Sequence, residues 1–229
     1  MDYVFSPAPQ ASVAVAGTAA RFPVRRIWCI GRNYADHARE MGHDPSREPP
    51  FFFQKPADAV VASGSVLNFP VQTSNLHHEI ELAVCLGRGG RDIPVEHALD
   101  QVFGYALALD MTRRDLQSIA KKAQRPWEMG KSFDESCPIS AVHPVAEIGH
   151  PQAGAITLSV NGEVRQSGNL DQMIWGVDEA IAHLSSYVAL APGDLILTGT
   201  PAGVGPCHAG DVLHGHCAGV DNLEVTYRT

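Results

Sequence analysis

Two glutamates lie two positions apart in the segment LHHEIELAV, residues 76–84, among apolar neighbours typical of a strand. Because side chains alternate between the faces of a strand, Glu79 and Glu81 are expected to project from one face. Two like charges on one face repel each other, and they are tolerated where that face meets solvent or a bound cation. This segment by itself is compatible with both arrangements.

A third carboxylate, Asp110, ends the apolar run GYALALD. A carboxylate at the end of a buried strand needs compensating charge. Mg2+ compensates it well, because this hard cation prefers oxygen ligands and usually keeps coordination positions for water or substrate. Three carboxylates without an adjacent thiol pair favour Mg2+ or Mn2+ over zinc.

A histidine and a glutamate lie three positions apart in ADHARE, where a short helix is expected. His37 and Glu40 then share one face of that helix. The carboxylate can orient the imidazole and raise its basicity, so that the imidazole takes a proton from water. A solvated helix face accounts for the same spacing.

Five further residues carry polar groups close to the predicted strands. Lys55 follows the apolar run FFFQ, and Lys131 follows a glycine that would let the backbone approach a ligand. Arg114 and Gln117 share one face of a predicted helix. Thr200 lies in the glycine-rich turn LTGTPAGVGP, which can present backbone N–H groups and a hydroxyl to an anion. Exposed lysines and a solvated helix face are the alternative interpretations.

Short strand-like runs separated by turns must position these groups; they are IWCI, FFFQ, EIELAVCL, VFGYALALD, AITLSV, DLILTG and LEVTY. Asn161-Gly162 predicts a two-residue hairpin turn. Apolar spacing predicts helices over residues 177–188 and after Thr112, and Asn33 can cap another short helix. Helices do not separate the strands regularly, so the predicted fold class is a β-rich α+β fold.

The chain of 229 residues can bury a large core, and 45% of its residues are hydrophobic. A formal charge of -8 repels nucleic-acid backbones and anionic membranes, so neither is expected as a partner. Five cysteines without a CxxC pair, together with the lack of a leader pattern or a membrane-length apolar run, predict a soluble cytoplasmic protein. Residues 1–21 are expected to form a short arm, and residues 22–229 a single domain.

The order of several segments resembles the fumarylacetoacetate hydrolase family, in particular its acylpyruvase and fumarylpyruvate hydrolase branch. The segments are GRNYADHAREMG, FFFQKPADA, HHEIELAV, GYALALDMTRRDLQ, KSFDESCPIS and LTGTPAGVG. The resemblance implies that the single domain is catalytic and forms a mixed β-sheet roll of the family's C-terminal-domain type. It also implies a homodimer and a divalent metal held by Glu79, Glu81 and Asp110.

The resemblance assigns a role to each remaining candidate. His37 and Glu40 match the family's catalytic dyad, and Lys131 lies near the metal and steadies developing negative charge. The substrate is held by residues that match family positions in contact with it: Lys55, Arg114, Gln117 and Thr200.

These implications predict a metal-dependent hydrolase that cleaves a C–C bond in 3-acylpyruvates, small diketo acids. Fumarylpyruvate would give fumarate and pyruvate in gentisate-type aromatic degradation, with His37 activating water and Lys131 stabilising the pyruvate enolate. Relatives use the same metal site for oxaloacetate decarboxylation or keto–enol isomerisation, and this is the alternative activity. A ligand-binding protein that has kept the fold without turnover is a further alternative.

Overall fold

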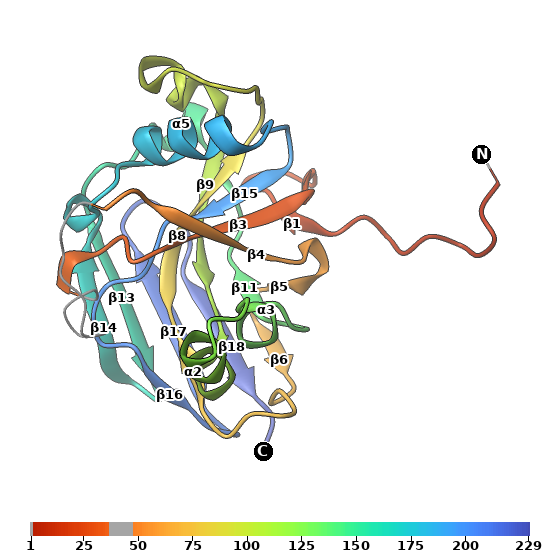
Figure 1. Cartoon of the computed structure of the whole chain (residues 1–229), viewed down its shortest axis with the longest axis vertical. Helices are drawn as coiled ribbons and strands as arrows, with labels where there is room; N and C mark the ends of the chain where they lie inside the picture. Colours follow the sequence, from red (N-terminus) through yellow and green to blue (C-terminus); the bar gives the residue numbers. More distant parts are fainter. Residues whose placement is uncertain (1, 37–47) are drawn as a thin grey trace.

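The computed structural model describes residues 2–36 and 48–229 (Figure 1). Within them, the largest sheet has the strand order β4-β3-β15-β8-β9-β11-β5, with β12 paired to β9. Its strands are β3 (Arg26–Gly31), β4 (Phe51–Lys55), β5 (Val60–Ala62), β8 (Ile80–Leu86), β9 (Val102–Leu109), β11 (Cys137–Ile139), β12 (His143–Pro144) and β15 (Asp194–Leu197). The sheet is mixed, because β3 and β15 run parallel, as do β5 and β11, whereas its other pairs are antiparallel.

A second sheet, with the order β14-β13-β17-β18-β6, forms the lower part of the molecule in Figure 1. Its strands are β6 (Ser65–Leu67), β13 (Ala155–Val160), β14 (Glu163–Asn169), β17 (Val212–Cys217) and β18 (Leu223–Tyr227). The predicted hairpin connects β13 to β14. Asn161 and Gly162 have φ angles of 53° and 83°, as a two-residue turn with two positive φ angles requires.

A three-stranded sheet joins β10 (Thr112–Arg113), β7 (Leu76–His78) and β16 (Gly205–Cys207), in that order. The single strand expected over residues 76–84 is therefore two strands, β7 and β8, which belong to different sheets. Glu79 lies between them. The chain turns at this residue, and the turn decides where its carboxylate points.

Four α-helices are assigned in the described residues: α2 (Arg114–Lys122), α3 (Glu128–Lys131), α4 (Val145–Ile148) and α5 (Val177–Tyr187). Single 3-10 turns are η1 (Ala57–Ala59), η2 (Val95–His97), η3 (Leu99–Gln101) and η4 (Leu170–Gln172). The helices predicted after Thr112 and over residues 177–188 are α2 and α5. Figure 1 shows α5 across the upper end of the large sheet and α2 beside the lower sheets. None of the helices in the described residues is long and apolar enough to span a membrane.

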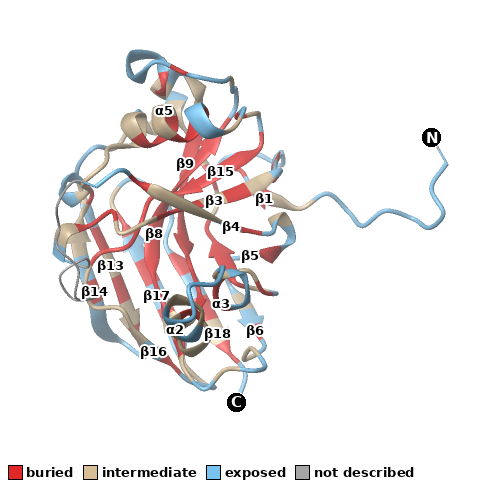
Figure 2. Ribbon diagram, in the orientation of Figure 1, coloured by how far each residue is buried: buried red, intermediate tan, exposed pale blue. Residues whose placement is uncertain are grey.

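The large sheet is buried on both faces. Strands β8 and β15 are buried along their whole length, as is most of β9 (Figure 2). Alternate residues of β8 and β9 enter two separate apolar clusters, with Leu82 and Leu107 in one and Ala83 and Ala106 in the other. The first cluster also contains Ile156 and Leu213, so it lies between the large sheet and the second sheet. The predicted β-rich α+β roll is confirmed.

A short pair of strands precedes the large sheet: β1 (Ser12–Ala14) and β2 (Arg21–Pro23). Val13 and Phe22 of this pair are buried in the second apolar cluster. Residues 2–10 are exposed and extend away from the domain in Figure 1. The division of the chain at residue 21 stays a prediction.

Candidate active site and metal centre

Two of the predicted metal ligands lie where an antiparallel ladder passes from one sheet to another. Glu79 separates β7 from β8, and Asp110 separates β9 from β10. Strand β8 pairs with β9 in the large sheet, and β7 pairs with β10 in the three-stranded sheet. Between these pairs, the Asp110 N–H donates to the Glu79 carbonyl at 2.8 Å. The bend between the sheets thus brings both carboxylates to one point.

Glu81 joins this pair from the buried strand β8. One carboxylate oxygen from each of Glu79, Glu81 and Asp110 lies within 4.8 Å of the other two. Each of the three residues is at most 5% exposed. The glutamates therefore do not face solvent, and the alternative arrangement of a solvent-facing strand is excluded.

The charges around this carboxylate cluster fit a divalent cation. In the part of the chain that the structure describes, Glu79 and Asp110 have ion pairs, whereas Glu81 has none and accepts from the Gly199 N–H at 2.6 Å. Burial raises the pKa of Glu81 well above its usual range, and the charges of Asp110 and Glu79 raise it further. A divalent cation would remove this repulsion, and Mg2+ and Mn2+ both accept oxygen ligands.

Lys131, at the end of α3, places its ammonium between two of the carboxylates. Nζ donates to Glu79 Oε2 and to Asp110 Oδ2, both at 2.7 Å. Burial lowers the pKa of Lys131, but Asp110 and Glu79 raise it by more, so the side chain stays charged. The preceding Gly130 permits a close approach of α3 to α2, because an added Cβ would lie 2.9 Å from the Gln117 nitrogen.

Lys55, at the end of β4, is buried behind Asp110. Its Nζ lies 2.9 Å from Asp110 Oδ1 and donates to the carbonyls of Met111 at 2.9 Å and Lys131 at 2.5 Å. Asp110 Oδ1 nevertheless accepts no hydrogen bond of suitable geometry from the described residues, so this oxygen is available to a cation. These contacts favour a supporting role for Lys55 over the predicted contact with substrate.

Arg114 opens α2 and forms an ion pair with Glu79. Its Nη1 donates to Gln117 Oε1 at 2.6 Å, and its Nε approaches His77 Nδ1 at 3.3 Å. Burial lowers the pKa of His77 to about 4, with a further contribution from Arg114, so this imidazole is neutral at pH 7. Arg114 and Gln117 both line the cavity beside the carboxylates.

Thr200 lies in the glycine-rich turn after β15 and lines the same cavity. The buried Gln166 positions it, because Nε2 donates to Thr200 Oγ1 at 2.7 Å and to the Pro201 carbonyl at 2.9 Å. Oε1 of Gln166 accepts from the Ile80 N–H at 3.1 Å. Sequence reasoning missed Gln166, since a single glutamine in a hairpin strand carries no motif.

Asn33, two residues after the end of β3, forms a hydrogen bond with the glycine-rich turn that follows β15. Its amide nitrogen donates to the carbonyls of Thr198 at 2.8 Å and Trp175 at 3.0 Å, and its Oδ1 accepts from the Trp175 N–H at 2.7 Å. These distant backbone groups engage the amide of Asn33. The helix that Asn33 was predicted to cap lies largely outside the described residues, so its role as a cap stays a prediction. Gly199 packs against Asn33 with a φ of +93°, and an added Cβ there would lie 2.7 Å from Asn33 Cβ.

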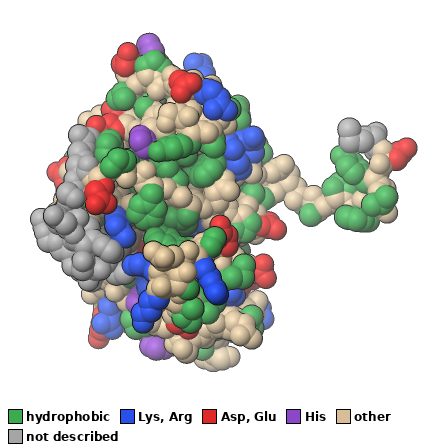
Figure 3. All heavy atoms as spheres, in the orientation of Figure 1, with side chains coloured by type: hydrophobic (Ala, Val, Ile, Leu, Met, Phe, Trp, Pro, Cys, Tyr) green, Lys and Arg blue, Asp and Glu red, His purple; other side chains and the backbone are tan. Residues whose placement is uncertain are grey.

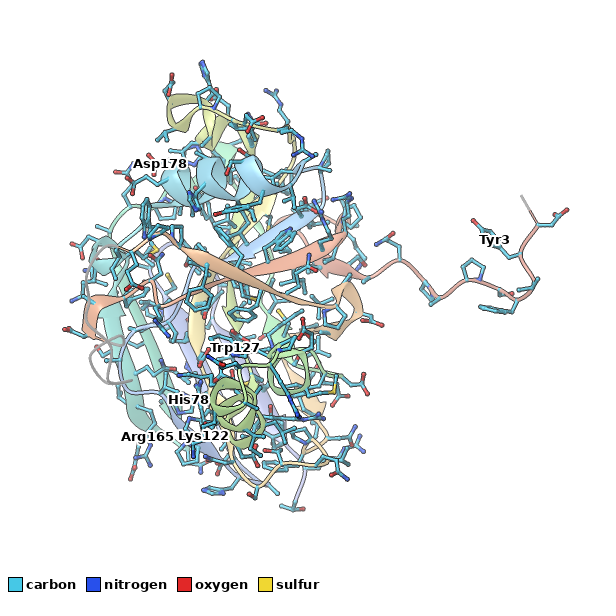
Figure 4. The ribbon with its side chains drawn as sticks, in the orientation of Figure 1. Tyr3, His78, Lys122, Trp127, Arg165 and Asp178 are labelled. Atoms are coloured by element: carbon cyan, nitrogen blue, oxygen red, sulfur yellow. The ribbon has the colours of Figure 1, made fainter. Side chains whose placement is uncertain are left out.

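The cavity beside the carboxylates has a volume of about 50 Å3, aromatic walls and a basic rim. Phe51 and Trp127 pack edge to face with ring centres 5.5 Å apart, and Trp127 lies between β4 and α2 in Figure 4. Arg32, Lys121 and Arg114 add cationic groups to the lining. These walls suit a small anionic molecule.

The structure thus brings together most of the predicted site residues: Glu79, Glu81, Asp110, Arg114, Gln117, Lys131 and Thr200. The predicted catalytic dyad, His37 and Glu40, lies outside the described residues. Its place relative to the carboxylate cluster stays a prediction.

The family model for the C-terminal domain of fumarylacetoacetate (FAA) hydrolase matches residues 26–227. This chain belongs to the fumarylacetoacetate hydrolase family, as the order of its sequence motifs predicted.

Named relatives of this chain act on small oxo acids. The mitochondrial oxaloacetate decarboxylase of Dictyostelium discoideum is 46% identical over 198 residues, which cover 86% of this chain and 90% of that protein. The oxaloacetate tautomerase YcgM of Escherichia coli (strain K12) is 44% identical over 198 residues, again covering 86% and 90%. The crystal structure of fumarylpyruvate hydrolase from Pseudomonas aeruginosa, in complex with Mn2+ and pyruvate, has a TM-score of 0.96 at 52% identity and 99% coverage of both chains.

The predicted main activity, hydrolysis of fumarylpyruvate and other 3-acylpyruvates, is corrected by these relatives. Curated relatives at 42–46% identity are named oxaloacetate tautomerases and an oxaloacetate decarboxylase, which agrees with the alternative activity. The physical reason for the error is that the sequence motifs place carboxylates and cationic groups around one cavity. Such a site can serve different reactions of oxo acids, so the motifs do not specify which bond changes.

Proposed function

We propose that this protein is a divalent-cation-dependent oxaloacetate keto–enol tautomerase, with Mg2+ as the cation. The observation that carries the proposal is the Lys131 ammonium, 2.7 Å from both Glu79 and Asp110, in a cavity with a basic rim. Negative charge that develops on the C2 oxygen of oxaloacetate would form beside these groups. The relatives named oxaloacetate tautomerases support the same reaction.

Tautomerisation is a proton transfer within one molecule. A base removes a proton from C3, the electron pair of that C–H bond forms the C2–C3 double bond, and the C2 oxygen takes up a proton. Glu79, Glu81 and Asp110 would hold a divalent cation, and its chemistry there would be to stabilise negative charge on an enolate oxygen.

The residues of the chain contribute charge and orientation. Lys131 holds a fixed ammonium at the point where the enolate forms, and one preorganised donor of this kind contributes about 2.7–4 kcal/mol to transition-state stabilisation. Gln117 and Thr200 line the cavity with an amide and a hydroxyl that can orient the bound oxo acid. Both side chains are held in place, Gln117 by Arg114 and Thr200 by Gln166.

We assign removal of the C3 proton to His37, oriented by Glu40, on the basis of their spacing in the sequence. Among the described residues, His77 and His78 directly precede Glu79; Nδ1 of His78 lies 2.9 Å from Gln166 Oε1, and His77 has both ring nitrogens engaged. Nδ1 lies 3.3 Å from Arg114 Nε, and Nε2 lies 2.9 Å from Asn75 Oδ1. His77 therefore has no free nitrogen for the substrate proton.

The test follows the ultraviolet absorbance of the enol as freshly dissolved oxaloacetate approaches keto–enol equilibrium, with Mg2+ and with EDTA. Lactate dehydrogenase and NADH in parallel samples measure pyruvate. We expect Mg2+-dependent acceleration of equilibration with little pyruvate release. Pyruvate formation at the rate of enol loss would instead identify a decarboxylase, and cleavage of a 3-acylpyruvate without acceleration of oxaloacetate equilibration would refute the proposal.

A homodimer and a cytoplasmic location follow from the family resemblance and from composition, and both stay predictions.

A further inference from the structure

Two cations at the cavity rim, Arg32 and Lys121, take no part in the carboxylate cluster. Both line the cavity that contains Glu79, Glu81 and Asp110, and both are partly buried. Within residues 2–36 and 48–229, neither forms an ion pair. Two partly buried cations that line one cavity and have no counter-ion among the described residues are suited to an anionic ligand.

The backbone holds Arg32 at the cavity in an unusual conformation. Its φ of 60° lies in the left-handed region, which is uncommon for a residue with a side chain. The next residue, Asn33, is anchored in the core by its amide, and the Arg32 guanidinium carbon lies 5.4 Å from the centre of the Phe51 ring. That ring in turn lies on Gly31, where an added Cβ would overlap it at 2.0 Å. Packing on both sides thus offsets the backbone strain at Arg32.

Lys121 reaches the rim from the last turn of α2. Its neighbour Lys122 is exposed and lies at the lower edge of α2 in Figure 4. Arg32, Arg114 and Lys121 all line this one cavity. Burial lowers the pKa of Lys121, and repulsion by Arg32 and Arg114 lowers it further. Figure 3 shows Lys and Arg side chains gathered around α2 on this face of the molecule.

We propose that Arg32 and Lys121 bind the second carboxylate of a dicarboxylic 2-oxo acid whose first carboxylate and C2 oxygen face the carboxylate cluster. This inference rests on the proposed function and adds the group that determines substrate class. A guanidinium can form two parallel hydrogen bonds with a carboxylate, and a lysine adds a mobile point charge. The pair therefore selects dicarboxylates over 2-oxo monocarboxylates.

The same contacts decide which bond of oxaloacetate changes. In decarboxylation the C3–C4 bond breaks, its electron pair forms the C2–C3 double bond of the enolate, and C4 leaves as neutral CO2. Two cations on the C4 carboxylate stabilise a charge that this reaction must remove, so they raise its barrier. Enolisation leaves the C4 carboxylate charged, so its contacts with Arg32 and Lys121 are kept in the transition state. The subsite thus favours tautomerisation over release of CO2.

Arg32→Leu and Lys121→Met test the subsite, with Lys122→Met as the matched control on the same helix. Three quantities are measured: KM for oxaloacetate tautomerisation, the inhibition constant of pyruvate, which lacks the second carboxylate, and CO2 released per tautomerisation event. We expect KM to rise about tenfold for each subsite variant, the loss of one charged contact, while pyruvate inhibition changes less than about twofold. The ratio of CO2 release to tautomerisation should rise in both variants and stay at the wild-type value in Lys122→Met.

Unchanged KM and CO2 ratio in both variants would overturn the subsite and leave the proposed function intact. An equal rise in the KM for oxaloacetate and in the inhibition constant of pyruvate would also overturn the subsite, because the substitutions would then act on the whole cavity. If the wild-type protein does not accelerate tautomerisation, the proposed function fails by itself. Calorimetric binding of oxaloacetate and pyruvate with Mg2+ then decides the subsite, and equal affinity of the wild type for the two acids would overturn it.

Discussion

Replacing Lys131 with methionine tests whether its ammonium stabilises the carboxylate cluster in the metal-free protein. The side chain is buried and donates charge-assisted hydrogen bonds of 2.7 Å to Glu79 and Asp110. Each contributes about 1.5–3 kcal/mol, and the lower value applies because Arg114 and Lys55 still face the two carboxylates, so the loss is about 3 kcal/mol. For a chain of this length, that loss lowers the melting temperature by about 6–12 °C in EDTA.

Saturating Mg2+ should recover most of this loss, because the cation then compensates the same carboxylates. Circular dichroism gives the melting temperatures of Lys131→Met and wild type in EDTA and in Mg2+. Lys122→Met, on the exposed side of α2, serves as a control that should change stability by less than about 0.5 kcal/mol. A loss below about 1 kcal/mol in EDTA would refute the charge argument, since it is less than one such bond contributes. An equal loss in EDTA and in Mg2+ would refute the role of the cation.

Two further substitutions test the surroundings of Glu81. The folded-state pKa of Glu81 lies above its usual value of 4.5. Between these two values the folded chain binds more protons than the unfolded chain. The free energy of unfolding in EDTA should therefore fall as pH rises from 4.5 toward the folded-state pKa. Denaturant titrations at several pH values should show a smaller slope for Glu81→Gln and for wild type with Mg2+; an undiminished slope in Glu81→Gln would assign the effect to other groups. Gly199→Ala forces Asn33 and the turn apart and should displace the N–H that Glu81 accepts, weakening Mg2+ affinity about 10–100-fold by calorimetry. Wild-type affinity in that variant would show that the turn adapts without moving the ligand.

Local sequence patterns were sufficient for the elements that carry the site. The hairpin at Asn161 and Gly162 follows from turn chemistry, and α2 and α5 follow from apolar spacing, which are properties of neighbouring residues. The convergence of Glu79 and Glu81 was predicted from the alternation of side chains along a single strand, and this reason holds only in part. Glu79 lies outside both strands, and the bend that orients it depends on pairing with β9 and β10, more than twenty residues further along the chain.

Contacts between distant segments were beyond sequence reasoning. Asn33 is satisfied by carbonyls 142 and 165 positions away, and Gln166 meets Thr200 across 34 positions, so no local pattern marks either residue. The positive φ of Arg32 depends on how Asn33 and Phe51 are packed. The reaction itself was mistaken because family membership does not specify it: relatives of this chain are named an oxaloacetate decarboxylase, oxaloacetate tautomerases and a fumarylpyruvate hydrolase.

Glu79 and Asp110 each lie between a strand of the large sheet and a strand of the three-stranded sheet. A cation bound there would cross-link the two sheets, so that pulling them apart would require its release. Local unfolding of this region is then coupled to dissociation of the cation. The concentration of free cation would determine how often the two sheets separate at Glu79 and Asp110. Depletion of the cation would thereby make the protein more susceptible to proteolysis.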